Sequence, residues 1–174
     1  MIKALFLDRD GVINVEKEYL YKIEEFEFIE GIFELCKHYQ DRGYEIFVVT
    51  NQSGIARGYY SQEDFEHLSA WMLQEFAKKK INIKKIYYCP HHPDISGECE
   101  CRKPRSGMLL SAKKEFGVDL ENSILVGDKE RDIEAALNAG LKETYFFDEA
   151  KNITNSKATK IVSKLGDIYN ADFK

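Results

Sequence analysis

Two aspartates one residue apart follow a short apolar stretch near the start of the chain. Asp8 and Asp10 come directly after the run from Ile2 to Leu7, and Gly11 follows them. A short, strongly apolar run is typical of a buried strand in a parallel sheet, and open α/β sheets bind their ligands at the carboxyl ends of such strands. A carboxylate can attack phosphorus, so the pattern places a candidate nucleophile where ligands bind.

Polar and charged side chains also come directly after later apolar runs. The run 46–49 is followed by Thr50 and the run 123–126 by a Gly-Asp pair ending in Asp128, while Lys103 precedes a predicted helix. Each residue alone is more often a turn, cap or surface residue, but their shared placement indicates a phosphoryl-transfer site. Because an attacking carboxylate repels a phosphate, a cation must offset the repulsion, and Mg²⁺ prefers oxygen ligands. We therefore predict Mg²⁺ at Asp8, Asp10 and Asp128, with Thr50 and Lys103 on the phosphoryl oxygens.

The composition is that of a folded, acidic protein. The chain has 174 residues, of which 44% are hydrophobic, so we expect one domain over residues 1–174. The net charge of −5 and the pI near 5.5 argue against a nucleic-acid partner. We find neither a signal-peptide pattern nor an apolar stretch of membrane-spanning length, so we expect a cytoplasmic protein with no membrane partner. No apolar surface patch is evident, and a monomer is expected.

Apolar runs and amphipathic segments alternate along the chain, which predicts an α/β fold with a mostly parallel sheet. Ser61 and Asp64 are spaced as in a capping box at the start of one helix. The expected strands are 2–7, 46–49, 83–88, 123–126 and 143–147, with 160–162 as a short edge strand, and the expected helices lie at 31–43, after Ser61, at 107–116 and at 133–139, with a last helical turn at 164–169.

A second group of candidate ligands lies in one short loop. Three of the four cysteines and two of the four histidines are found there, with C-x-H and C-x-C spacings that suit tetrahedral Zn²⁺. A disulfide is the alternative, but the odd number of cysteines in the loop and the histidine between them favour a metal in a cytoplasmic chain. Four protein ligands leave no position for water, so the Zn²⁺ is expected to be structural. The predicted ligands are Cys89, His91, Cys99 and Cys101, in a zinc loop of residues 89–101.

At these positions the chain resembles the haloacid dehalogenase (HAD) superfamily of phosphatases. The matching motifs are Asp8-x-Asp10-x-Val12, Thr50, Lys103 and Gly127-Asp128-x-x-x-Asp132. The resemblance implies a single Rossmann-like core, with Asp8 as the nucleophile and Asp10 as the general acid and base. It also implies Mg²⁺ ligation by the Asp8 carboxylate, the Asp10 backbone carbonyl and the Asp128 carboxylate. Asp132 lies in the first turn of a predicted helix, where the helix dipole favours an acid in any case, so we expect it to support the site only indirectly.

The zinc loop and its surroundings are similar to those of the D,D-heptose 1,7-bisphosphate phosphatases. This resemblance implies removal of the C7 phosphate from D-glycero-D-manno-heptose 1,7-bisphosphate, a small-molecule sugar bisphosphate, during synthesis of nucleotide-activated heptose for surface polysaccharide. Two alternatives stay open: the protein could be a histidinol-phosphate phosphatase, or a zinc-stapled module that binds Mg²⁺ without turnover. The anomer of the heptose bisphosphate that is preferred also stays open. The stretches that carry the resemblance are 51–58, 87–93, 101–104 and 107–110.

A substrate with two phosphates requires two anion-binding regions. Arginine suits the second phosphate, because its planar guanidinium can bind two oxygens. The loop after the first strand and the zinc loop are the two visible insertions, and neither is long enough to form a cap domain. We therefore expect a capless, open site whose loops set specificity. The reacting phosphate is predicted at Asp8, Thr50, Asn51 and Lys103, and the second phosphate or the sugar at Arg57, Arg102 and Lys129. In the resembled family the loop after the first strand also touches substrate, which maps to Glu16, Lys17, Glu18 and Tyr19, and Gln52 and Ser53 complete the predicted contacts.

Overall fold

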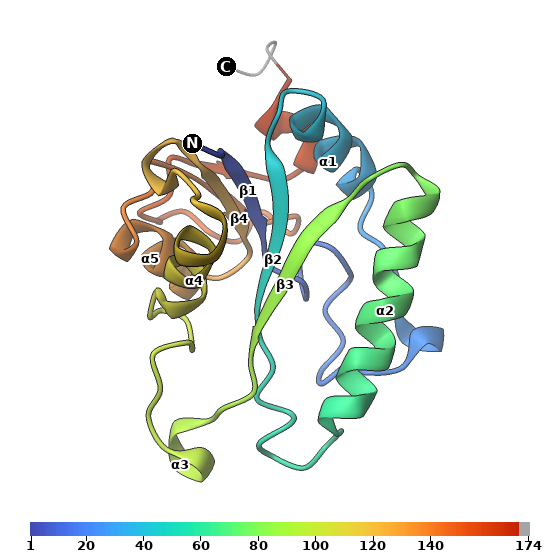
Figure 1. Ribbon diagram of the computed structural model, residues 1–174. Helices are drawn as coiled ribbons and strands as arrows, with labels where there is room; N and C mark the ends of the chain where they lie inside the picture. The colour runs from blue at the N-terminus through green and yellow to red at the C-terminus, as the bar shows by residue number, and fades with distance from the viewer. Residues whose placement is uncertain (171–174) are drawn as a thin grey trace.

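A six-stranded parallel sheet forms the centre of the computed structural model, which describes residues 1–170 (Figure 1). The predicted domain therefore extends four residues beyond the described part of the chain. Each pair of neighbouring strands is parallel, in the order β3-β2-β1-β4-β5-β6, which confirms the expected α/β class. The strands are β1 (Ala4–Leu7), β2 (Glu45–Asn51), β3 (Ile83–Cys89), β4 (Ile124–Gly127), β5 (Glu143–Phe147) and β6 (Lys160–Val162).

Helices cover both faces of the sheet and enclose two apolar cores. Because side chains alternate along a strand, Leu5 and Leu7 of β1 enter one core while Ala4 and Phe6 enter the other. Residues of α1 and α2 complete the first core and residues of α4 and α5 the second, on opposite sides of the sheet in Figure 1. In the described residues, no helix has the length and apolar character needed to cross a bilayer. The helices are α1 (Ile32–Gln40), α2 (Gln62–Lys78), α3 (Pro93–Ser96), α4 (Gly107–Phe116) and α5 (Glu130–Asn138).

Most predicted elements are present, with differences at their ends. The predicted bounds of β5, β6 and α4 agree with those observed, and the capping box of Ser61 and Asp64 starts α2. β2 continues two residues past its predicted end, so that Thr50 and Asn51 belong to the strand. α5 begins at Glu130 rather than at residue 133, because Asp132 caps its first turn. Sequence reasoning missed α3 and two of the 3₁₀ turns: η1 (Ile23–Glu25) and η2 (Leu120–Asn122) are new, whereas η3 (Leu165–Ile168) lies within the predicted last turn.

The strand order explains where a site can form. It reverses direction between β1 and β4, which are neighbours in the sheet but not in the sequence. At such a switch point the connections from the two strands leave toward opposite faces, which opens a crevice at their carboxyl ends. Asp8 follows β1 and Asp128 follows β4, so both acids lie at this crevice.

Candidate active site

The turn after β1 passes very close to the turn after β4. Gly11 has a φ of +93°, and a Cβ atom built on it would lie 2.0 Å from a carboxylate oxygen of Asp128. Only glycine combines that backbone conformation with so close an approach. The glycine after the two aspartates therefore allows the β1 and β4 acids to share one site.

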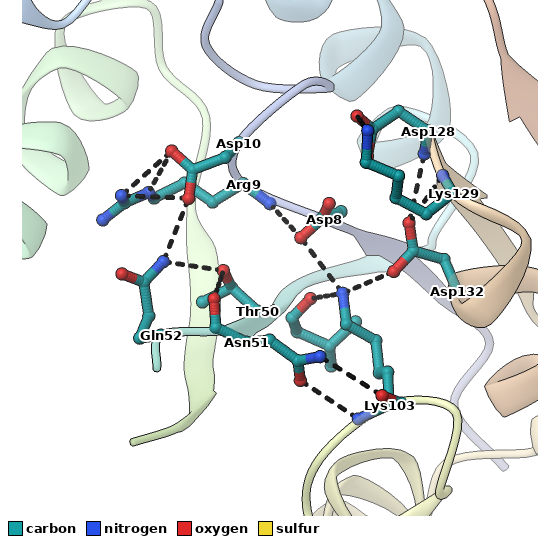
Figure 2. Close-up of polar contacts among 11 residues, drawn as sticks. Asp8, Arg9, Asp10, Thr50, Asn51, Gln52, Lys103, Asp128, Lys129 and Asp132 are labelled. Carbon is teal, nitrogen blue, oxygen red and sulfur yellow. Dashed lines mark hydrogen bonds and ion pairs between the residues drawn. The ribbon is translucent and has the colours of Figure 1, made fainter. Parts of the chain in front are cut away.

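Lys103, which follows the zinc loop, contacts both Asp8 and Asp132. Its ammonium nitrogen lies 3.0 Å from Asp8 Oδ1 and 2.7 Å from Asp132 Oδ1, and it also donates to the backbone carbonyl of Val49 at 2.8 Å (Figure 2). Only 3% of the lysine is exposed. Burial alone would lower the pKa of Lys103, but the carboxylates of Asp132 and Asp8 outweigh it and raise the pKa. The lysine is therefore a fixed positive charge beside Asp8.

Asp8, Asp128 and Asp132 form a compact acidic cluster. One carboxylate oxygen from each lies within 4.8 Å of the other two. Burial raises the pKa of Asp8 well above its ordinary value despite the opposing effect of Lys103, and burial likewise raises the pKa of Asp128. Asp128 Oδ1 is buried without a hydrogen-bond partner in the described part of the chain. Buried oxygen donors that lack a partner fit a hard divalent cation such as Mg²⁺.

The Asp10 side chain points away from this cluster, toward the opposite side of the turn (Figure 2). Arg9 Nη2 lies 3.0 Å from both Asp10 oxygens, and Asn14 Nδ2 donates to Oδ1 at 3.0 Å. Gln52 Nε2 donates to Oδ2 at 3.1 Å. Asp8 and Asp10 thus have different partners, which is what two neighbouring acids with different roles require.

The two residues after Thr50 use their amides within the protein. Gln52 Nε2 donates to Thr50 Oγ1 at 2.9 Å, and Gln52 Oε1 accepts a hydrogen bond from the Tyr60 hydroxyl. Asn51 accepts from the backbone N–H of Lys103 at 3.0 Å and donates to its carbonyl at 3.3 Å. This pair of bonds attaches the chain at Lys103 to the end of β2.

Most of the predicted site residues line one polar pocket of ≈ 340 Å³. Of the residues predicted to contact the phosphates, the sugar or Mg²⁺, two do not: Thr50 is fully buried beneath the pocket, and the Lys17 ammonium donates to the Glu25 carbonyl at 2.7 Å. Burial raises the pKa of Glu16, and the nearby charges of Asp10 and Asp128 add to the shift. The predicted residues in the pocket wall are Asp8, Asp10, Glu16, Glu18, Tyr19, Asn51, Gln52, Ser53, Arg57, Arg102, Lys103, Asp128 and Lys129.

The pocket also contains residues that sequence reasoning missed. Arg9, Tyr60 and Arg131 all contribute to its wall. Arg9 is 2% exposed, although arginine is normally a surface residue. Its position between Asp8 and Asp10 at the end of a predicted strand could have identified Arg9 as a site residue from the sequence. Nothing in the local sequence distinguishes Tyr60 from its exposed neighbour Tyr59.

The four predicted zinc ligands converge in the structure. Their ligand atoms lie within 4.8 Å of one another, and His91 Nδ1 is 3.5 Å from Cys89 Sγ and 3.3 Å from Cys101 Sγ. Cys99 Sγ lies 3.6 Å from the Sγ atoms of both Cys89 and Cys101, and these two Sγ atoms are 2.7 Å apart. A tetrahedral Zn²⁺ with bonds of about 2.0–2.3 Å holds its ligand atoms about 3.3–3.8 Å apart. All four cysteines of the chain are free thiols in the structure. The donor types and four of these five distances therefore fit Zn²⁺, whereas the Cys89–Cys101 separation is shorter than a tetrahedral site gives. That separation still exceeds the roughly 2.05 Å of a disulfide bond, so the disulfide alternative is not supported.

Comparisons with known proteins agree with this geometry. A HAD-hydrolase-like family model matches residues 100–168. A D-glycero-α-D-manno-heptose-1,7-bisphosphate 7-phosphatase from Campylobacter jejuni is 56% identical over 87% of this chain and 91% of its own length. The β-anomer enzyme from Haemophilus influenzae is 44% identical over 88% and 86%. A crystal structure of the D,D-heptose 1,7-bisphosphate phosphatase from B. bronchiseptica, complexed with magnesium and phosphate, has a TM-score of 0.81 and 28% identity and covers 94% of both chains. The chain belongs to the D-glycero-D-manno-heptose-1,7-bisphosphate 7-phosphatase family of HAD-like hydrolases.

Proposed function

We propose that this chain hydrolyses the C7 phosphate ester of D-glycero-D-manno-heptose 1,7-bisphosphate and releases heptose 1-phosphate and inorganic phosphate. The observation that carries the proposal is the buried contact of 3.0 Å between Lys103 and Asp8 at the base of a polar pocket. This arrangement presents one carboxylate oxygen to an incoming phosphate while a fixed cation lies beside it. The identity of the substrate is inferred from the Campylobacter jejuni and Haemophilus influenzae relatives described above, which are heptose-1,7-bisphosphate 7-phosphatases.

Two residues of the acidic cluster, Asp8 and Asp128, are suited to hold Mg²⁺ together with the backbone of Asp10. The proposed ligands are the carboxylates of Asp8 and Asp128 and the backbone carbonyl of Asp10. The unpartnered Asp128 Oδ1 supports this assignment, as does the magnesium complex of the B. bronchiseptica relative. When bound, the cation would neutralise negative charge on the carboxylates and on the phosphoryl oxygens.

The reaction we propose has two displacements. In the first, an Asp8 carboxylate oxygen attacks phosphorus, the bond from phosphorus to the C7 oxygen breaks, and Asp10 donates a proton to that oxygen. In the second, Asp10 removes a proton from water, whose oxygen attacks the acyl phosphate and restores the Asp8 carboxylate. Lys103 lowers the repulsion between Asp8 and the phosphate, and Thr50 lies behind the phosphate and supports the Gln52 amide.

The remaining pocket residues fit the sugar and the second phosphate. Arg57, Arg102 and Lys129 provide positive charge on the pocket wall for the C1 phosphate. Glu16, Glu18 and Tyr19 offer groups that can hydrogen-bond sugar hydroxyls. Lys17, which has protein partners, is proposed to brace this loop from outside.

We propose that Zn²⁺ in the zinc loop is structural. Arg102 and Lys103 come directly after Cys101, so a metal that holds Cys89, His91 and Cys101 together also places both basic residues. The loop would then bring Lys103 to Asp8. We further propose a cytoplasmic monomer that acts in the synthesis of nucleotide-activated heptose for surface polysaccharide. Reduced cysteines persist in a reducing compartment, which supports the cytoplasmic location.

Side-by-side kinetics test the proposal. Purified protein with Mg²⁺ should release phosphate from heptose 1,7-bisphosphate with a kcat/KM at least about a hundredfold above that for histidinol phosphate, because buried or pocket-wall charges discriminate strongly between substrates. Both anomers are supplied separately, since relatives of each preference are similar to this chain. Preference for histidinol phosphate, or no turnover of either substrate, would overturn the assignment.

A further inference from the structure

The Tyr60 hydroxyl lies at the end of a hydrogen-bonded chain that leads to Asp10. Its hydroxyl donates a hydrogen bond to Gln52 Oε1, and the same amide donates through Nε2 to Asp10 Oδ2 at 3.1 Å and to Thr50 Oγ1 at 2.9 Å. A hydrogen-bonded chain thus runs from the phenol, through one amide, to the general acid and to the hydroxyl beneath the pocket.

The phenol determines which way the Gln52 amide faces. An amide has an acceptor end and a donor end, and a rotation of 180° about its last torsion exchanges them. Burial raises the pKa of Tyr60 to about 12, so the phenol stays protonated at neutral pH and remains a donor. Because the phenol occupies the oxygen end, the NH₂ group faces Asp10 and Thr50. Gln52 is 2% exposed, and its amide has protein partners at both ends, so it supports the site from below.

The ring of Tyr60 is itself held in place. It stacks on the ring of Tyr21, with centroids 5.5 Å apart and an interplanar angle of 17°. Gly54 lies directly against it, since a Cβ atom at that position would be 2.2 Å from Tyr60 Cε1. The tyrosine is 7% exposed. These contacts leave the hydroxyl little freedom, so it can fix the orientation of another group.

We propose that Tyr60 is a positioning residue for catalysis: through Gln52, its hydroxyl holds the Asp10 carboxyl group where it can protonate the leaving oxygen. The inference rests on the proposed function, in which Asp10 is the general acid. Without the hydroxyl, the Gln52 oxygen loses its partner, so the amide is free to rotate away from Asp10 and Thr50. Asp10 would then lose one of its donors and shift from its position, while the nucleophile and the phosphate site would stay as they are.

The test uses esters that differ in their need for a proton. The leaving group of phenyl phosphate is a basic phenolate that benefits from protonation, whereas nitrophenolate leaves p-nitrophenyl phosphate readily without it. For Tyr60→Phe we expect kcat with phenyl phosphate to fall about tenfold with KM unchanged, a fraction of the roughly 10²–10⁴-fold that general acid catalysis supplies. With p-nitrophenyl phosphate the change should be less than about twofold. Tyr59→Phe is the matched control, because Tyr59 is 54% exposed and its hydroxyl makes no hydrogen bond within the described part of the chain.

Two further variants keep the inference falsifiable if Tyr60→Phe is unstable. Gln52→Met removes the amide at similar size and should show the same dependence on the leaving group. In the Gln52→Met background, Tyr60→Phe should have no further effect, because the pair acts through one bond. Equal losses with both esters, or an unchanged kcat for Tyr60→Phe, would overturn the inference. Wild-type turnover of heptose bisphosphate, measured in parallel, tests the proposed function separately, since the two aryl esters report on Tyr60 whichever sugar is the substrate.

Discussion

The ammonium group of Lys103 lies 3.0 Å from a carboxylate oxygen of Asp8, and both residues are buried. The two residues are 95 positions apart in the sequence. One follows β1 and the other follows the zinc loop, so this contact joins the two parts of the molecule that the proposed reaction needs.

Replacing Lys103 with methionine should remove activity and destabilise the fold. The substitution leaves Asp8 and Asp132 buried without their shared counter-charge, and breaking a buried ion pair from one side costs about 3–5 kcal/mol. Urea denaturation measures the loss. Lys129→Met is the control, since that side chain is 53% exposed and 3.8 Å from Asp128, and it should change stability by less than about 1 kcal/mol. Equal losses from the two variants would contradict the role of Lys103.

The acidic cluster should make stability depend on pH when Mg²⁺ is absent. Burial raises the pKa of Asp8 and Asp128 above the ordinary 3.8, so the folded state binds protons that the unfolded state has already released. Stability in Mg²⁺-free buffer should therefore rise as pH falls from neutral toward about 4, and the raised pKa of each acid marks where its effect begins. Asp8→Asn should be more stable than wild type at neutral pH, with a difference that shrinks on acidification.

Mg²⁺ addition provides the complementary measurement. A free concentration about a hundredfold above Kd should stabilise wild type by about 2.7 kcal/mol and Asp8→Asn by much less. Glu149→Gln, at an exposed position, should behave like wild type throughout. The proposed cluster would be contradicted if Asp8→Asn were no more stable than wild type at neutral pH. It would also be contradicted if Mg²⁺ stabilised Asp8→Asn as much as wild type.

Substituting Cys99 by serine should release zinc and loosen the loop that carries the basic residues. We expect about one Zn²⁺ per wild-type chain and a large loss in the variant, with a lower Tm and a raised KM but with Mg²⁺ binding intact. Elemental analysis and thermal denaturation measure both effects. Cys36→Ala is the control: this buried cysteine packs in the first core, so its loss should lower Tm without loss of zinc. Wild-type stability after verified zinc loss would argue against a structural metal.

Arg102 should recognise the phosphate that is not hydrolysed. Arg102→Lys keeps the charge but loses the planar fork, so we expect KM for heptose 1,7-bisphosphate to rise about tenfold and KM for heptose 7-phosphate to change little. Arg105→Lys is the matched control, because Arg105 lies nearby but pairs with Glu98 and Glu100 at the surface. A similar rise for both substrates would show that Arg102 does not contact the second phosphate.

The elements of the fold were predictable where local pattern determines them. The strand β1 is a continuous apolar run, β5 contains one and α4 is amphipathic, and the burial of each element follows from its pattern. The positions of Asp8 and Asp128 in the site were predictable for a related reason. Both acids follow strands of a parallel sheet, and the carboxyl ends of such strands meet at one edge.

Contacts within the site were not predictable in the same way. Gln52 lies in a polar turn that suggests contact with a ligand, yet its amide bonds to Asp10, 42 residues away, and to Tyr60. Which partner an amide finds depends on how segments distant in sequence pack together. The same holds for Arg9, whose burial depends on the Leu20 carbonyl and on the ring of Phe65.

The covalent intermediate on Asp8 offers the most direct test of the proposed chemistry. Wild-type protein is mixed with heptose 1,7-bisphosphate labelled in the C7 phosphate, quenched in acid during turnover and digested, and the labelled peptide is identified by mass spectrometry. We predict an acid-stable, base-labile label on Asp8 in wild type and none in Asp8→Asn, which should also lose turnover by several orders of magnitude while remaining folded. A label on another residue, or turnover that persists in Asp8→Asn, would contradict the assignment of Asp8 as the nucleophile.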